Sequence, residues 1–176
     1  MEPEGLILNS GGSQTFTEFE SQETENELAI GSALLKPSDF DLNSLKNFQP
    51  ACWIATPVLK EQSSQLPGAS TISALLKATG IIGNHAGFIY GGNWQAQPVY
   101  PQSMQRMRPF GFSSNQECYT FKQGDYPKVD DFVFFRPKQS EALLLQFGNI
   151  AAYRSGQIKN WWPVLGYPQS LYSVQP

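Results

Sequence analysis

Short apolar runs separated by turn residues are the feature that most limits how this chain can fold. These runs occupy residues 5–10, 28–35, 51–59, 86–90, 132–135, 142–145, 149–154 and 157–162. Runs of this length between Gly, Pro, Asn or Ser are typical of strands. Ser155-Gly156 joins the last two runs, which predicts a β-hairpin. We therefore predict a mainly β fold, an antiparallel β-domain that can close into a barrel and carries a few short helices.

Helical spacing is found in two segments. Asp39 or Asp41 can cap a short helix that continues to Phe48, because an aspartate side chain accepts the free amide hydrogens of a first helical turn. Residues 69–79 carry apolar side chains at helical spacing and are followed by a glycine, which predicts an amphipathic helix. Residues 94–110 are predicted to be an irregular loop, whose length indicates either function or packing against another segment.

Length and composition limit the class of protein. With 176 residues, of which 40% are hydrophobic, the chain can bury one sizeable core, so one compact domain is expected. Twelve Lys and Arg residues stand against 15 Asp and Glu without a basic cluster, so nucleic acid is not an expected partner. No apolar run approaches the roughly 18 residues of a membrane span, and the N-terminus lacks the order of a signal peptide. We predict a cytoplasmic protein that does not enter a membrane.

Familiar catalytic motifs are absent from the sequence. Its single histidine, His85, lies in a predicted loop, where a lone histidine is more often structural than catalytic. No nucleophile elbow, Walker loop or Cys-His metal spacing occurs. Cys52 and Cys118 lie in no CxxC pattern and are predicted to be reduced, buried thiols. The chain therefore carries no self-contained site of a familiar type.

Three segments resemble, in the same order, parts of one enzyme family. ILNSGGSQTF (7–16), followed by NELAIGSALLKPSDFD (26–41), is similar to the end of the barrel and the start of the β-domain in fold-type III pyridoxal-phosphate enzymes of the D-threonine aldolase and D-serine dehydratase group, which is alanine-racemase-like. GFIYGGNWQ (87–95) resembles that group's strand ending in a glycine turn. Residues 129–164 resemble its closing element, in which a strand, a metal-binding turn and a hairpin end in a Trp-Pro pair.

The resemblance implies the C-terminal portion of such an enzyme. In the family the lysine that binds pyridoxal phosphate lies near the start of an α/β barrel, and this sequence begins at the position of that barrel's last strand. Residues 1–25 would be the remnant of that strand with a phosphate-type turn and an acidic loop, and residues 26–176 would be the β-domain. Without the lysine, the chain alone is not expected to perform the family's chemistry.

Three functions remain open at this point. The first is the β-domain of a pyridoxal-phosphate enzyme acting on D-amino acids, with dehydration or aldol cleavage favoured over racemisation. The second is a non-catalytic binding or scaffold domain derived from that family. The third is an interaction module whose exposed aromatic residues, Trp94, Trp161 and Trp162, contact a partner.

Partners follow from the first of these functions. The complete enzyme would take a D-amino acid as its small-molecule ligand. Leu6, Ile7 and Leu8 are expected to be exposed, because the missing barrel would otherwise cover them. We therefore expect a homo-oligomer or pairing with a separate barrel chain.

A proline-led turn carries the family's metal ligands, a histidine and, two residues later, a cysteine or aspartate. The matching residues here are Gln139 and Glu141, and the family's second histidine-bearing turn matches SSNQE (113–117), nearest Gln116. A glutamine is a poor zinc ligand, whereas Glu141 can bind a hard divalent metal through oxygen. The alternative is a metal-free cavity wall formed by Gln116, Gln139, Glu141 and Tyr90.

Strand geometry makes a specific prediction about this wall. Residues two apart on an extended strand share a face, so Gln139 and Glu141 are expected to point into one cavity while Lys138 and Ser140 face away. The turn at residues 113–117 is expected to approach the same cavity. Tight zinc binding is not expected, since one carboxylate alone seldom holds the ion.

The Gly-Gly-Ser turn is the candidate cofactor site. Backbone amides at Gly11, Gly12 and Ser13 can approach an anion closely because glycine has no side chain, and the serine hydroxyl adds a donor. An ordinary flexible turn has the same composition. Together with the family order, the turn is predicted to contact the phosphate of pyridoxal phosphate in the complete enzyme.

Overall fold

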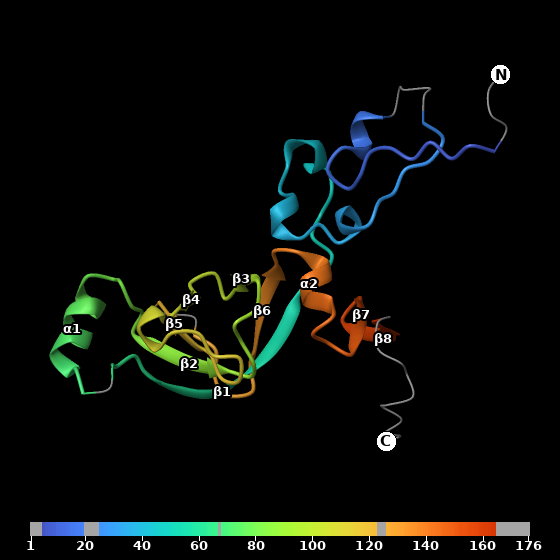
Figure 1. Ribbon diagram of the computed structural model, residues 1–176. Helices are drawn as coiled ribbons and strands as arrows, with labels where there is room; N and C mark the ends of the chain where they lie inside the picture. The colour runs from blue at the N-terminus through green and yellow to red at the C-terminus, as the bar shows by residue number, and fades with distance from the viewer. Residues whose placement is uncertain (1–4, 20–24, 67, 123–125, 165–176) are drawn as a thin grey trace.

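A curved antiparallel sheet forms the main body of the protein (Figure 1). The computed structural model describes residues 5–19, 25–66, 68–122 and 126–164. The sheet contains six strands, and a separate two-stranded hairpin follows it. The strands and α-helices are β1 (Ile54–Ser63), α1 (Ser70–Ala78), β2 (His85–Ile89), β3 (Ala96–Tyr100), β4 (Gln105–Arg106), β5 (Cys118–Phe121), β6 (Phe132–Pro137), α2 (Ser140–Leu144), β7 (Asn149–Arg154) and β8 (Gln157–Pro163).

The six strands are hydrogen-bonded in the order β3-β6-β1-β2-β5-β4, and every neighbouring pair is antiparallel. β1 joins the two halves of the sheet, because its first residues pair with β6 and its later residues with β2. The pairing of β1 with β2 shifts between Val58 and Lys60, and such an irregularity increases local bending and twist. The sheet therefore curls into a nearly closed, barrel-like form, which confirms the predicted fold class.

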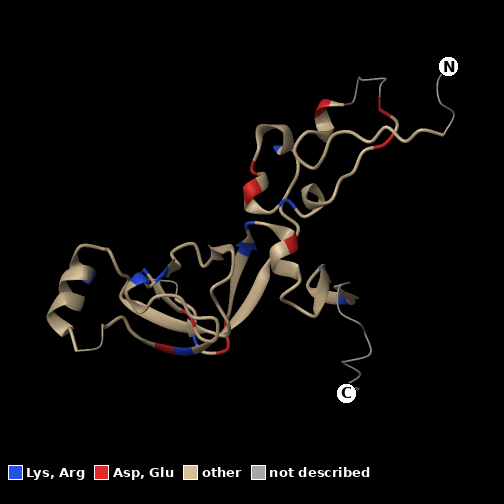
Figure 2. Ribbon diagram, in the orientation of Figure 1, with Lys and Arg blue, Asp and Glu red and all other residues tan. Residues whose placement is uncertain are grey.

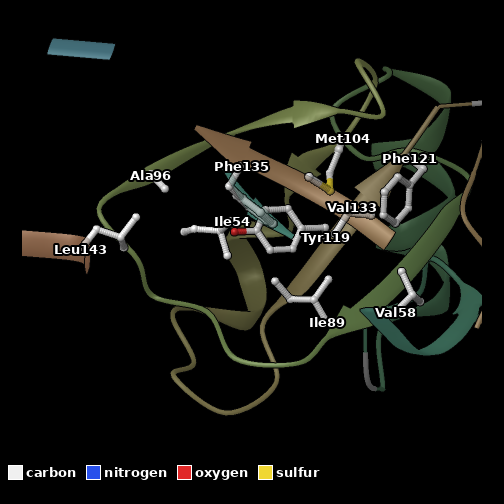
Figure 3. Packing of buried hydrophobic residues seen from close by; sticks show 10 residues of the cluster. All are labelled: Ile54, Val58, Ile89, Ala96, Met104, Tyr119, Phe121, Val133, Phe135 and Leu143. Carbon is white, nitrogen blue, oxygen red and sulfur yellow. The ribbon is translucent and has the colours of Figure 1, made fainter. Parts of the chain in front are cut away.

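The hydrophobic core fills the inside of this curved sheet (Figure 3). β6 shows the alternation that builds it, since Val133 and Phe135 are fully buried whereas Phe132 is 53% exposed. The rings of Tyr119 and Trp94 meet the Phe135 ring edge-on, at centroid distances of 5.2 and 5.5 Å. The buried cluster comprises Ile54, Val58, Ile89, Ala96, Met104, Tyr119, Phe121, Val133, Phe135 and Leu143.

Several predicted elements are confirmed. The helix predicted at 69–79 is α1, and the hairpin predicted at 149–162 is β7 and β8. The runs at 51–59, 86–90 and 132–135 fall largely within β1, β2 and β6. Among the described residues, no helix is long and apolar enough to cross a membrane.

The predictions for residues 5–48 were mostly wrong. Residues 5–10 and 28–35 are not strands; Asn9 and Glu27 form one isolated bridge, and residues 32–34 form a single 3-10 turn. Residues 39–48 contain two 3-10 turns, Ser38–Phe40 and Asn43–Leu45, in place of one helix. The expected capping by Asp41 fails because its carboxylate binds Arg136 instead.

The prediction of an irregular loop at residues 94–110 was also wrong. It contains β3, β4 and a 3-10 turn at Arg108–Phe110, and it packs Ala96, Met104 and Met107 into the interior. Packing against the sheet explains its length, which was one of the two alternatives. β5 was not predicted, although all four of its residues are buried.

Both cysteines are free, as predicted. Cys118 is buried, and its thiol lies 3.6 Å from the sulfur of Met107. Burial raises the pKa of Cys118 to about 12, and the nearby Glu117 carboxylate adds to this shift. Cys52 is only half-buried, and burial raises its pKa as well.

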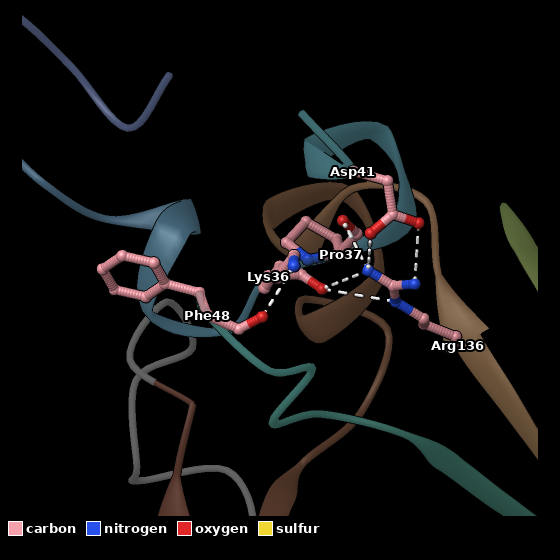
Figure 4. A network of polar contacts seen from close by, with 5 residues as sticks. All are labelled: Lys36, Pro37, Asp41, Phe48 and Arg136. Atoms are coloured by element: carbon pink, nitrogen blue, oxygen red, sulfur yellow. Dashed lines mark hydrogen bonds and ion pairs between the residues drawn. The ribbon is translucent and has the colours of Figure 1, made fainter. Parts of the chain in front are cut away.

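Arg136 attaches the N-terminal part of the chain to β6 (Figure 4). Its two terminal nitrogens lie 2.9 and 2.7 Å from the carboxylate oxygens of Asp41, and it also donates to the carbonyls of Lys36 and Pro37. Lys36 in turn donates to the carbonyl of Phe48 at 2.6 Å. A bidentate arginine–carboxylate pair has fixed geometry, so this group holds residues 36–48 in place.

Acid is expected to loosen this attachment. Hydrogen bonds from Arg136 lower the pKa of Asp41 in the folded protein. A carboxyl of this kind stabilises the folded state fully at pH values above its unfolded-state pKa of about 4. That stabilisation is lost as the pH falls through the folded-state pKa. Hydrogen-exchange protection of amides 36–48, relative to the sheet, should therefore fall below about pH 4. Asp41→Asn should lose that pH dependence, whereas Asp130→Asn should retain it. Equal pH profiles for all three proteins would contradict the assignment.

Candidate functional site

Two of the predicted site segments meet at a polar cluster that we call the serine–glutamate cluster, formed by Ser13, Gly31, Ser32, Ser140 and Glu141. The Ser13 hydroxyl accepts a hydrogen bond from the Gly31 amide at 3.1 Å. The Ser32 hydroxyl donates to the Glu141 carboxylate. The hydroxyls of Ser32 and Ser140 lie 3.2 Å apart. The Gly31–Ser32 dipeptide therefore links the glycine turn to the start of α2.

Glu141 is held as a carboxylate in this cluster. It lies in the first turn of α2, where the backbone amide and the Ser140 hydroxyl are close to it. The hydrogen bond from Ser32 is the main cause that lowers the pKa of Glu141, and its own backbone amide adds to the effect. Glu141 is exposed, so its charged oxygens also face solvent and can accept from a ligand.

The strand geometry predicted for residues 139–141 was wrong. Residues 142–145 do not form a strand, since α2 covers Ser140–Leu144. Gln139 is the extended residue before this helix, so the two-residue strand spacing does not relate it to Glu141. Lys138 and Ser140 also differ from the prediction that they share a face, because Lys138 is exposed and Ser140 is buried.

The glycine turn has groups that fit a phosphate. Gly11 has φ +74°, and a Cβ there would lie 2.8 Å from the Phe19 ring, so the turn requires glycine. Ser13 uses its oxygen as an acceptor, which leaves its hydroxyl hydrogen for a ligand. The Ser10 hydroxyl oxygen is buried and has no hydrogen-bond partner among the described residues. The Gly12 amide is less available, because it lies 3.3 Å from the Thr15 hydroxyl.

Gln116 and Tyr90 lie beside a second glycine turn, at residues 91–93. The Gly91 amide donates to Asn115 at 2.6 Å, and the Glu117 amide donates to Gly91 at 3.0 Å, so Gln116 and Gly91 form a parallel bridge. Tyr90 directly precedes this turn and is 65% exposed, and Gln116 is exposed as well. The Gln116 amide donates to the Ser113 hydroxyl, whereas Glu141 accepts from Ser32.

Glu117 is a buried charged residue that the sequence analysis did not identify. Only 1% of it is exposed, yet it accepts hydrogen bonds from the Asn93 amide and the Tyr119 hydroxyl, both at 2.9 Å. The Nε of Arg106 lies 2.8 Å from its other oxygen, as an ion pair without the alignment of a hydrogen bond. Burial and the Glu117 carboxylate raise the pKa of Tyr119. A glutamate directly before an apolar strand was the available signal.

The second glycine turn depends on this buried carboxylate. Gly92 has φ +140°, and a Cβ there would lie 2.4 Å from the Cβ of Glu117 and from the Ser113 carbonyl oxygen. Glu117 thus fixes the turn from Gly91 to Asn93 against β5 through packing and charge. This arrangement positions the backbone of the turn. The Glu117 carboxylate is buried, so a ligand cannot reach it.

The residues present do not fit a divalent metal. In the part of the chain that the structure describes, no three His, Cys, Asp or Glu side chains come together. Glu141 offers one carboxylate, already bonded to Ser32, and a structural or catalytic metal generally needs several protein ligands.

Other candidates from the sequence have structural surroundings. His85 is half-buried in β2, and its ring stacks on Tyr126 with centroids 3.6 Å apart. Trp94 packs on the core, so it does not belong to an exposed aromatic set. Trp161 and Trp162 are each more than half exposed on β8.

The fold defines the protein as a barrel-like antiparallel β-domain preceded by an irregular N-terminal segment. A similar solved structure is the D-threonine aldolase from Filomicrobium marinum, with a TM-score of 0.65 and 14% identity. The similarity covers 89% of this chain and 40% of that protein, so the chain spans less than half of its length. No family model matches the sequence, and no curated protein matches it. The comparison shows a distant fold relationship.

Proposed function

We propose that this chain forms the C-terminal β-domain of a pyridoxal-phosphate enzyme acting on D-amino acids, with lyase chemistry of the dehydratase or aldolase type. The observation that carries the proposal is the fold similarity to a D-threonine aldolase over 89% of the chain. Residues 1–25 would correspond to the end of the enzyme's α/β barrel and residues 26–176 to its β-domain. Residues 20–24 of the acidic loop lie outside the described residues.

The serine–glutamate cluster would form this domain's contribution to the active site. Pyridoxal phosphate, when bound, acts as an electron sink for bonds at the substrate α-carbon. Gly11, Gly12 and Ser13 would hold its phosphate, and the Ser13 hydroxyl has a hydrogen to donate. Glu141, kept ionised by Ser32, would accept from the cationic amino group of the substrate. Tyr90, Gln116 and Gln139 stay predicted wall residues.

The lysine that binds the cofactor would come from the α/β barrel, outside the portion of the enzyme to which we assign this chain. We therefore expect the chain alone to lack lyase activity. Adding a separately expressed α/β barrel chain, or joining one in frame, should produce aldol cleavage of D-threonine or dehydration of D-serine. The same proposal implies that the complete enzyme uses pyridoxal phosphate and lies in the cytoplasm.

Phosphate binding can be tested without activity. Adding pyridoxal phosphate to the 15N-labelled chain should shift the amide signals of Gly11, Gly12 and Gly31, because these residues form the turn and its link to Ser32. Pyridoxal, which lacks the phosphate, should not shift them. Ser13→Ala should weaken the binding, whereas Ser103→Ala, which removes a hydroxyl between β3 and β4, should not. Absence of any change at the turn would refute the phosphate assignment and favour the scaffold function.

A binding or scaffold role is the second candidate, and the β7–β8 hairpin favours it. Tyr153, Ile158, Trp161 and Trp162 are all more than half exposed there. Every residue of β8 is exposed, and an isolated two-stranded hairpin has marginal stability in water. Loss of partner binding in Trp161→Ala, with the phosphate site unchanged, would support this role.

A further inference from the structure

Residues 62–122 are nearly free of acidic side chains. Glu117 is the one acidic residue of this stretch, which contains the basic residues Lys77, Arg106, Arg108 and Lys122. Glu117 is buried and pairs with Arg106, so it presents no negative charge at the surface. Figure 2 shows a basic position on α1 and acidic positions along the N-terminal segment, at the other end of the molecule. The part of the surface around α1 therefore favours anionic partners.

A surface hollow lies between the end of β1 with the loop that precedes α1 and the 3-10 turn Arg108–Phe110. It is lined mainly by Gln62, Ser63, Gln65, Leu66, Phe88 and Phe110. The rings of Phe88 and Phe110 meet edge-on, with their centroids 6.1 Å apart. The volume of the hollow is about 530 Å³, which lies in the range of pockets that bind small molecules, so a large side chain can enter it.

Three basic side chains adjoin this hollow, each from a different element. The Lys60 ammonium on β1 lies 6.0 Å from the centre of the Phe88 ring. Lys77 on α1 donates to the Ser63 hydroxyl at 3.1 Å. Arg108 begins the 3-10 turn that lines the hollow. Among the residues that the structure describes, none of these three cations forms an ion pair, so their charges are available to a partner.

The nearest acidic residue in sequence does not neutralise the hollow. Glu61 pairs with Gly87 across β1 and β2, whereas Lys60 pairs with Phe88. Successive residues of a strand point to opposite faces of a sheet. Lys60 therefore lies on the face of Phe88 and the hollow, and Glu61 lies on the other face.

This combination of groups suits an acidic peptide segment that carries one bulky apolar side chain. The apolar side chain would cover the rings of Phe88 and Phe110 and remove their apolar surface from water. Because the three cations stand on separate elements around the hollow, several carboxylates spaced along a chain match them better than one. Gln62 and Gln65 can donate to and accept from the backbone of such a segment.

The chain's own acidic N-terminal segment does not reach the hollow. That segment joins the sheet through residues 36–48 and Arg136, at the opposite end of the molecule from α1 (Figure 1). In the proposed enzyme the barrel would be joined at that same opposite end. The acidic segment that fits the hollow must therefore come from elsewhere.

We propose that the hollow is a docking site for an acidic segment of a different protein. The bulky apolar side chain of that segment would lie against Phe88 and Phe110, and its carboxylates would face Lys60, Lys77 and Arg108. Complementary charge would speed the encounter and select against basic segments. This inference does not depend on the binding of pyridoxal phosphate.

Titration of the 15N-labelled chain with a capped Asp-Glu-Phe-Glu-Asp peptide tests the proposal. The amide signals of Gln62, Gln65, Phe88 and Phe110 should shift, whereas that of Gly11 should not. Salt should weaken the binding. The capped peptides Asn-Gln-Phe-Gln-Asn, which has no charge, and Asp-Glu-Ala-Glu-Asp, which has no ring, should each bind on the order of tenfold more weakly.

Two variants of the chain separate the charged and the apolar contacts. Lys60→Gln with Arg108→Gln removes two charges, and Phe110→Ala removes one ring; all three side chains are exposed, so the fold should be retained. Each variant should bind the peptide on the order of tenfold more weakly than the wild-type chain. Lys159→Gln on β8 is the matched control, because it removes an exposed charge away from the hollow, and it should bind like the wild-type chain.

Several outcomes would overturn the proposal. One is the absence of shifts around the hollow, and another is equal binding of the charged and the uncharged peptide. Unchanged binding by the variant of Lys60 and Arg108 would also overturn it. Binding to phosphatidylserine vesicles in place of the peptide would assign the hollow to a membrane surface, and self-association that the same variant abolishes would assign it to a second copy; both results contradict docking of a different protein.

Discussion

Glu117→Ala is expected to lower the free energy of unfolding by about 3–5 kcal/mol, because removing one partner of a buried charged group leaves the other groups unpaired. Arg106 would lose its ion-pair partner, and the Asn93 amide and Tyr119 hydroxyl would lose their acceptor. The turn at Gly91–Asn93 would lose the carboxylate that it packs on. Urea unfolding followed by tryptophan fluorescence measures the change, with Trp94 beside this turn.

Glu61→Ala provides the control, because Glu61 is an exposed carboxylate on β1. Its substitution should change the unfolding free energy by less than about 0.5 kcal/mol. Glu117→Gln should fall between the two, since an amide oxygen still accepts hydrogen bonds but carries no charge for Arg106. A loss below about 1 kcal/mol for Glu117→Ala would show that the buried network does not hold the turn.

Phe135→Ala is expected to cost about 3–5 kcal/mol of unfolding free energy, because it removes a fully buried ring and leaves a cavity. Phe135 lies at the centre of the core, with Tyr119 and Trp94 packed edge-on against it. The same measurement applies, and the fluorescence of Trp94 in the folded state should also change.

Phe132→Ala is the matched control for this substitution. It removes the same ring from the same strand, at a position that is 53% exposed. Its cost should be well under half that of Phe135→Ala, because less apolar area is removed from water on folding. Equal costs for the two variants would mean that the inside and outside of β6 are wrongly assigned.

The sequence predicted the elements in which the local pattern and the final environment agree. Val133 and Phe135 alternate with exposed or half-buried residues in β6, and the Ser155-Gly156 turn closes the β7–β8 hairpin. The spacing of residues 69–79 predicts α1, although Ile72 and Leu75 are 56 and 64% exposed and only Leu76 of its apolar face packs on the interior. These sequence patterns are local, so the structures that they predict form independently of contacts with distant parts of the chain.

Wrong predictions arose where tertiary contacts decide between alternatives. The apolar run 142–145 is compatible with either a strand or a helix. In the structure it forms the last part of α2, because Leu143 packs into the core from that helix. Residues 94–110 supply strands because β6 and β5 offer open edges to them. Residues 28–35 have no neighbouring strand in the described structure, so their apolar character does not produce one.

The sequence by itself determined the β class and the uneven charge, because these depend on composition and local order. Only the tertiary structure decided which polar residues meet. Ser32 joins the glycine turn to Glu141 across 109 residues of sequence, and Glu117 is buried beside Arg106 by the pairing of β4 with β5. Contacts between residues far apart in sequence depend on how the sheet closes, and no local pattern encodes that closure.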